Sequence, residues 1–303
     1  MKKFFIRGGI LLVINLLIAS YFLFQAYSKD DHIFFHYTQT ESVLGSTPSD
    51  TEYDLLLMGS SHGRIFSRSG NHLKVERILG LKMANISRSG AGVVPEQTYL
   101  EYFYLKGNKT KTIVYFIDPF ALSTVKWNER LYFLTDEPFK FEFLPLLFKN
   151  GIETDVIYNY VKSKFLKSWQ KDHGMITEDA TYCLKHIVQE SVEKRTAAIY
   201  PDGFKPAVFN NYLDELEKTI KFAQRHTCRL IFIIPPTLLG WTPGQPQLLG
   251  RLKFFKEKFG VPFYDYSMVI RKPQLFYNHD HMNVRGVAFF TSSYLKPIVR
   301  QLP

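Results

Sequence analysis

The chain has 303 residues, of which 46% are hydrophobic and 22% charged, with a formal net charge of +10. This length suits one large domain, or one domain with an insertion, beside any terminal segment. Two cysteines, Cys183 and Cys228, are too few for a disulfide framework, although they could form one bridge or stay free. The basic residues form no long run, so we read them as solvated surface with a mild attraction to anionic lipid or polymer, and we expect no nucleic-acid partner.

The N-terminal residues 8–27 form an uncharged apolar run that follows basic residues, namely Lys2, Lys3 and Arg7. About 20 residues at a 1.5 Å rise span a ~30 Å hydrocarbon core, and positive charge in front places the N-terminus inside. A cleavable signal peptide would have a shorter core ending in small residues, whereas this run ends in bulky aromatic ones. We therefore predict an uncleaved single-span anchor at 1–28 and an extracytoplasmic C-terminal domain, periplasmic or outer-surface. The alternatives are a signal peptide and a buried soluble helix.

After a polar, irregular stretch at 29–50, which predicts a linker, apolar runs alternate with helical patterns. The runs that predict strands lie at 54–58, 81–86, 112–117, 229–234 and 262–266, and the helical patterns at 95–107, 211–226, 247–259 and 284–300, the last interrupted near Pro297. Strands of this length between helices predict parallel βαβ units covered on both faces. We therefore predict one α/β domain at 51–303, a three-layer α/β/α sandwich with a mainly parallel five-stranded sheet. Residues 120–205 break this rhythm and predict an aromatic-rich helical insertion.

The first predicted strand ends in Gly59-Ser60-Ser61-His62-Gly63, which matches the G-x-S-x-G nucleophile elbow of α/β-hydrolases. That elbow normally follows several strands and an upstream oxyanion loop, and nothing between the apolar run and Asp54 supplies either. Ser61 still lies at the carboxyl end of a strand, where open α/β sheets place their sites. The competing interpretation is that Ser60 and Ser61 only cap a helix.

Three blocks, in order, resemble the SGNH (GDSL-like) hydrolases. They are Gly59-Ser60-Ser61 after the first strand, Asn85-Ile86-Ser87-Arg88-Ser89-Gly90 after the second, and His281-Met282-Asn283 with Gly286 near the C-terminus. Ser60 stands where the family has Asp, as in membrane-anchored branches that resemble the D-alanyl-transfer protein of teichoic-acid modification. The resemblance implies an SGNH/flavodoxin-like fold, Ser61 as nucleophile, His281 as base, and an oxyanion hole from the backbone N–H groups of Ser61 and Gly90.

Two positions depart from the family pattern. Asp118 stands where the family has its oxyanion-hole Asn, so either an Asn comes from elsewhere or Asp118 has another role. Asn278 stands where the family has its triad Asp, and an amide oxygen can still accept from Nδ1–H of an imidazole. Asp280, next to His281, points elsewhere if the family's loop geometry holds, and Asp265 is a remote substitute.

Other polar residues in these blocks have two interpretations each. His62 follows the nucleophile and either lines the pocket or lies at the surface, and Arg88 and Arg64 either meet an anionic substrate or are ordinary exposed arginines. The sequence His279-Asp280-His281 offers metal-ligand types, but no second cluster supports it, so we expect no metal and no cofactor. The aromatic residues of the insertion form either core or an acyl or sugar platform.

The residues therefore predict a membrane-anchored serine esterase or O-acyltransferase that acts on ester-linked acyl groups of a cell-envelope polysaccharide or lipid. Water and an acceptor hydroxyl would use the same residues, so hydrolysis and transfer are not distinguished. The alternative is a catalytically degenerate domain that binds an envelope polymer or partners a membrane-bound acyltransferase.

Overall fold

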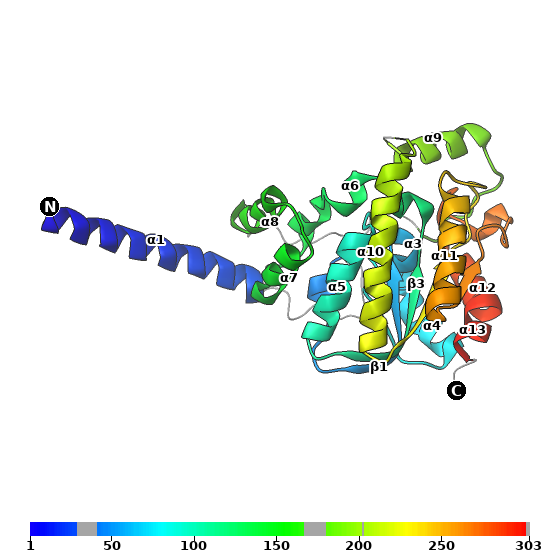
Figure 1. Cartoon of the computed structure of the whole chain (residues 1–303), viewed down its shortest axis with the longest axis horizontal. Coiled ribbons are helices and arrows are strands. Elements are labelled where there is room, and N and C mark those ends of the chain that lie inside the picture. Colours follow the sequence, from blue (N-terminus) through cyan, green and yellow to red (C-terminus); the bar gives the residue numbers. More distant parts are fainter. Residues whose placement is uncertain (29–40, 167–179, 202, 301–303) are drawn as a thin grey trace.

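The computed structural model describes residues 1–28, 41–166, 180–201 and 203–300. Five parallel strands form one sheet in the order β2-β1-β3-β4-β5 (Figure 1). Their bounds are β1 Glu52–Gly59, β2 Met83–Asn85, β3 Lys109–Phe116, β4 Arg229–Ile234 and β5 Phe263–Asp265. In the register of β1, Leu57 faces Asn85 of β2 and Val114 of β3. The prediction of a five-stranded parallel sheet is confirmed, with strand ends that differ by a few residues.

Helices cover both faces of this sheet. On one face lie α5 Val93–Leu105, α10 Pro206–Arg225 and α11 Gln245–Phe259, and on the other α4 Asn71–Leu79, α12 Val284–Phe290 and α13 Lys296–Arg300 (Figure 1). Central strand residues alternate between the two cores, with Leu56 in one and Leu57 in the other, both fully buried. Burial on both faces explains why the strands are continuous apolar runs without polar alternation.

The C-terminal helical pattern is interrupted, as its proline suggests. A π-helical turn, Thr291–Leu295, separates α12 from α13, in which Pro297 is the second residue. Proline has no N–H and its ring crowds the preceding turn, so the widened turn lies just before it.

The segment between β3 and β4 is mainly helical where the structure describes it. It contains α6 Val125–Asn128, α7 Leu144–Lys149, α8 Thr154–Leu166 and α9 Gln189–Ile199. Its aromatic residues lie in both environments, since Phe139 and Phe143 are buried in the core whereas Tyr132 and Phe141 are exposed. The predicted insertion thus contributes both core and surface.

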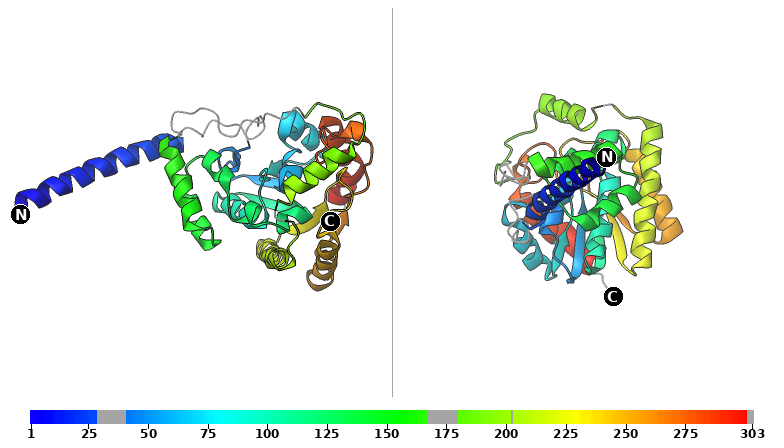
Figure 2. Two further views of the ribbon diagram at one scale, coloured as in Figure 1. Left: turned by 90° about the horizontal axis from the view of Figure 1, so that it is seen from above. Right: turned by 90° about the vertical axis from the view of Figure 1, so that its left-hand side faces the viewer.

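The N-terminal helix α1, Lys2–Ser28, projects from the domain as a long arm (Figure 1). Its stretch Lys2–Phe22 has a mean hydropathy of 1.9 and none of the residues in its most apolar window is buried, so it is long and apolar enough to cross a membrane. At its inner end Phe22 packs edge-on against Phe165 of α8, which runs across α1 rather than along it (Figure 2).

Part of the predicted linker packs against the domain. Residues 29–40 lie outside the described residues, but Glu41–Thr47 are largely buried and include the short helix α2, Val43–Ser46. Val43 and Leu44 join the hydrophobic core on the α5 side of the sheet. The chain is therefore fixed to the domain from Glu41 onward.

Candidate active site

The turn after β1 holds Ser61 at the carboxyl edge of the sheet. Ser61 opens the four-residue helix α3, Ser61–Arg64, and the Ser60 hydroxyl accepts from the His62 backbone N–H at 3.4 Å. Gly59 before it has φ +138°, and a Cβ there would lie 2.3 Å from the Phe116 carbonyl oxygen of β3. Only glycine fits this close approach, so packing against the β3 backbone explains the first glycine of the motif.

His281 comes from the loop before α12, where the Asn283 side chain caps the helix by accepting from the N–H groups of Arg285 and Gly286. Its Nε2 lies 2.6 Å from Ser61 Oγ. Its Nδ1 lies 3.2 Å from Asn278 Oδ1, which also accepts from the backbone N–H of His281 at 2.7 Å. Because Asn278 Oδ1 is an acceptor, Nδ1 carries the proton, which leaves Nε2 free to take a proton from Ser61.

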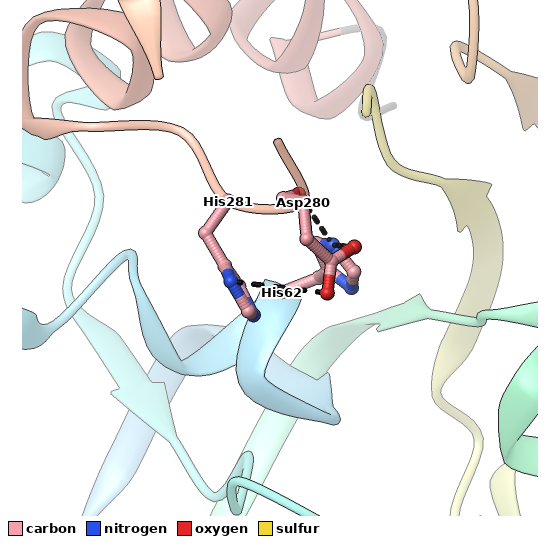
Figure 3. Close-up of side chains that lie close together, drawn as sticks. All are labelled: His62, Asp280 and His281. Atoms are coloured by element: carbon pink, nitrogen blue, oxygen red, sulfur yellow. Dashed lines mark hydrogen bonds and ion pairs between the residues drawn. The ribbon is translucent and has the colours of Figure 1, made fainter. Parts of the chain in front are cut away.

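The Asp280 side chain lies next to those of His281 and His62 (Figure 3). One carboxylate oxygen is 3.0 Å from His62 Nε2, and the other is 3.9 Å from His281 Nδ1. Arg195 of α9 donates to that second oxygen through Nε at 2.9 Å and Nη2 at 2.7 Å. Asp280 therefore contacts His62 and Arg195 directly, and acts on His281 only through the electrostatic effect of a nearby charge.

His62 is buried between two carboxylates. Its Nδ1 lies 2.9 Å from Asp118 Oδ1, opposite the contact that its Nε2 makes with Asp280. The second Asp118 oxygen accepts from the Ser60 hydroxyl at 2.6 Å. Burial alone would lower the pKa of His62, but Asp118 and Asp280 outweigh burial and raise that pKa well above its ordinary value. His62 is thus an imidazolium at neutral pH, and Asp118 is its counter-ion.

The His62 ring also stacks on the His281 ring, with centroids 4.8 Å apart and planes inclined by 27°. The Tyr277 ring stacks on His281 at 5.5 Å and 8°. Burial lowers the pKa of His281 well below 6.5; the His62 charge lowers it further, and Asp280 opposes both. His281 is therefore a neutral imidazole at neutral pH, as a general base must be.

Two backbone N–H groups are candidates for an oxyanion hole. Ser61 is the first residue of α3, so its N–H has no partner within that helix. Gly90 has φ +75°, a conformation that favours glycine, and a Cβ there would lie 3.0 Å from the Trp127 ring. Among the residues that the structure describes, neither N–H donates a backbone hydrogen bond.

Glu96, in the first turn of α5, joins the two turns that carry these groups. Its carboxylate accepts from the backbone N–H of Gly59 at 2.9 Å and of Arg88 at 3.2 Å. Burial raises its pKa well above the ordinary value. Sequence reasoning missed Glu96; the signal was an acidic residue in the helix turn directly after the Ser89-Gly90 turn.

The remaining sequence candidates take structural roles. Asn85 Oδ1 accepts from the Ser87 N–H at 2.9 Å, an Asx turn that shapes the second block. Arg88 is buried and pairs with Glu41 and Glu137, both at 3.4 Å, rather than facing a cleft. Asp265 accepts from Ser267 and makes no described contact with His281.

One group could in principle hold a metal ion, since ligand atoms of His62, Asp280 and His281 lie within 4.8 Å of one another (Figure 3). The donor set fits a proton network better. His62 Nε2 also meets the Asp280 backbone oxygen at 2.8 Å, and Arg195 already neutralises the carboxylate. A divalent metal ion would add positive charge beside two cations, His62 and Arg195.

No protein-family model matches the chain, and no curated protein matches it. The interpretation of the site therefore depends on its geometry and on the resemblance of the three sequence blocks.

Proposed function

We propose that the chain is a membrane-anchored serine esterase or O-acyltransferase that acts on ester-linked acyl groups of a cell-envelope polysaccharide or lipid. The observation that carries this proposal is the 2.6 Å separation of Ser61 Oγ and His281 Nε2, across 220 residues of sequence. A nucleophile in reach of a neutral imidazole that a third residue orients is the arrangement nucleophilic catalysis requires.

In the proposed reaction Ser61 Oγ attacks the ester carbonyl carbon while His281 Nε2 takes the hydroxyl proton. The N–H groups of Ser61 and Gly90 donate to the resulting oxyanion, which supplies several kcal/mol of stabilisation. The carbon–oxygen bond to the leaving alcohol then breaks, and the alcohol takes the proton from Nε2. Asn278 Oδ1 and the nearby Asp280 charge stabilise the imidazolium that exists between these steps.

The acyl group then leaves Ser61 by the reverse sequence. Water or an acceptor hydroxyl gives a proton to His281 and attacks the acyl-serine, and Ser61 recovers its proton. Water gives hydrolysis and an acceptor hydroxyl gives transfer, with the same residues.

The proposed membrane location is supported by α1, which is long and apolar enough to cross a membrane. Phe22, at the end of the apolar stretch, contacts Phe165, which puts α8 at the boundary of the bilayer that α1 would cross. The basic residues at the start of the helix favour an extracytoplasmic domain. A reporter enzyme that works only outside the cytoplasm, fused to the C-terminus, should be active. Activity of a reporter that works only in the cytoplasm would contradict this orientation.

The test of the reaction is covalent labelling by a fluorophosphonate probe together with turnover of acetyl and longer-chain esters. Ser61→Ala should abolish both. Ser292→Ala, which removes an exposed hydroxyl on the π turn, is the matched control and should leave both unchanged. Labelling of Ser61→Ala at the wild-type rate would refute the assignment.

A second candidate is a catalytically degenerate domain that binds an envelope polymer or partners a membrane acyltransferase. It is favoured by Asn278 and Asp118, which replace the triad Asp and the oxyanion Asn of the family pattern. It predicts a folded wild-type protein that is not labelled, and a harmless Ser61→Ala substitution in cells.

A further inference from the structure

A second buried charge cluster lies beside the active-site turns and is not used by the proposed reaction. Three arginines, Arg64, Arg68 and Arg88, surround the carboxylate of Glu41, and all four side chains are nearly inaccessible to solvent. Arg68 Nε lies 2.7 Å from one Glu41 oxygen, and Arg88 Nη1 lies 3.4 Å from the other. Arg64 Nε is 4.0 Å away.

The cluster contacts both halves of the candidate active site. The Ser89 hydroxyl, next to Gly90, donates to Glu41 and accepts from Arg68 Nη2 at 2.6 Å. Arg68 Nη1 donates to the Tyr277 hydroxyl at 3.3 Å, and the Tyr277 ring stacks on His281. A single carboxylate therefore connects the turn of the oxyanion donor to a ring that packs against the base.

The charges show why a carboxylate is needed there. Within the described residues Glu41 is the carboxylate within 4.0 Å of all three arginines, whereas Glu137 and Asp136 pair with Arg88, so loss of Glu41 removes the counter-charge that the three arginines share. Burial alone would raise the pKa of Glu41, but Arg68, Arg64 and Arg88 outweigh burial and lower it to about 2. Arginine forks suit a planar carboxylate in particular.

We propose that Arg64, Arg68 and Arg88 form a carboxylate-binding site, occupied here by Glu41, and that its occupant holds the Ser89-Gly90 turn and Tyr277 in their catalytic positions. Glu41 is a positioning residue supplied by the segment that follows the membrane helix. In a variant without this side chain the site takes a small free monocarboxylate, such as formate or acetate. The effect on catalysis depends on the proposed function, whereas binding of the carboxylate does not.

The experiment is chemical rescue of Glu41→Ala in the full chain, with formate or acetate added at rising concentration and chloride as the ionic-strength control. Two quantities are measured: the midpoint of thermal unfolding, and the rate of Ser61 labelling by a fluorophosphonate. We expect Glu41→Ala to unfold on the order of 10 °C lower. We expect it to label roughly 10- to 100-fold more slowly, because small displacements of positioned groups cost rates of that size. Formate should restore part of both losses and leave the wild type unchanged.

Two further variants test the interpretation. Glu41→Gln keeps the shape but not the charge and leaves no space for formate, so it should lose labelling without rescue. Glu101→Ala removes another buried glutamate, whose charged partner is the exposed Lys149 rather than an arginine cluster, and its unfolding midpoint should not respond to formate. Glu41→Gln also keeps the test informative if Glu41→Ala does not fold.

The outcomes separate the two proposals. Rescue of both the unfolding midpoint and labelling supports the site and its positioning role. Rescue of the midpoint in a protein that never labels, wild type included, supports the carboxylate site and refutes the esterase proposal. A Glu41→Ala midpoint that formate does not raise, or Glu41 variants that label at the wild-type rate, would overturn the proposal made here.

Discussion

Replacing His62 by glutamine should move the acid limb of the pH–rate profile, where protonation of His281 stops the reaction, to higher pH. His62 carries a positive charge between Asp118 and Asp280, and its ring lies 4.8 Å from that of the proposed base. A positive neighbour disfavours protonation of His281, so the His62 charge helps to keep the base free. Glutamine removes the charge while retaining hydrogen-bonding groups.

The size of the shift follows from the distance. At 4.8 Å, two unit charges repel by about 3.5 kcal/mol at an effective dielectric constant of 20, which is an upper bound on what the His62 charge contributes against protonation of His281. Removing this repulsion raises the pKa of His281, by less than this energy implies because a more polarisable site screens the interaction. The same substitution leaves two buried carboxylates with fewer cations, which should lower the free energy of unfolding by about 3–5 kcal/mol.

The assay is the rate of fluorophosphonate labelling against pH, for wild type and for His62→Gln that near-ultraviolet circular dichroism shows to be folded. His279→Gln is the matched control, because His279 lies in the same loop but accepts from the Val188 N–H instead of stacking on the base. Its acid limb should coincide with that of the wild type. An acid limb of His62→Gln that stays in place, or moves to lower pH, would refute the role given to His62.

Three other results are expected. Asn278→Asp should raise the pKa of His281 and stabilise its imidazolium, whereas Asn278→Ala should lower kcat/KM about tenfold or more because the Nδ1 proton loses its acceptor; equal rates for both variants would contradict this. The pKa of Glu41 is lowered from 4.5 to about 2, so its contribution to the free energy of unfolding, about 3 kcal/mol, is present above pH 4.5 and is lost as pH falls toward 2. When the free energy of unfolding is measured against pH, Glu41→Gln should therefore lose less of it in acid than the wild type. A chelator such as EDTA should leave labelling unchanged, since Arg195 already pairs with Asp280, the carboxylate of the group that could bind a metal; a loss restored by Zn²⁺ would count against this assignment.

Several features of the site follow from local sequence. Gly59 and Gly90 have backbone conformations that favour glycine; Gly59 ends β1 and Gly90 lies in the turn after β2, so their position near the carboxyl edge of the sheet could be predicted. The order of the three blocks made Ser61, Asn278 and His281 candidates. In the structure the His281 ring lies within hydrogen-bonding distance of both Ser61 and Asn278. Parallel strands meet at one edge, which makes such convergence predictable.

Other features could not be predicted in the same way. Nothing in the sequence around Asp118 or around Asp280 indicates that both carboxylates face the His62 imidazole. The burial of Glu41 was hidden because residues 29–50 read as a polar linker. In each case the partner lies far along the chain, and a charged residue is typical of exposed surface unless a partner compensates it.

The sequence by itself determined the sheet of parallel strands, its helical cover and the apolar N-terminal helix, because these depend on the periodicity and length of apolar runs. Only the tertiary structure decided where the charges go: His62 between Asp118 and Asp280, and Glu41 among three arginines. The physical reason is that a buried charge is stable only with its partners in place, and which partners meet depends on the packing of loops from distant parts of the chain.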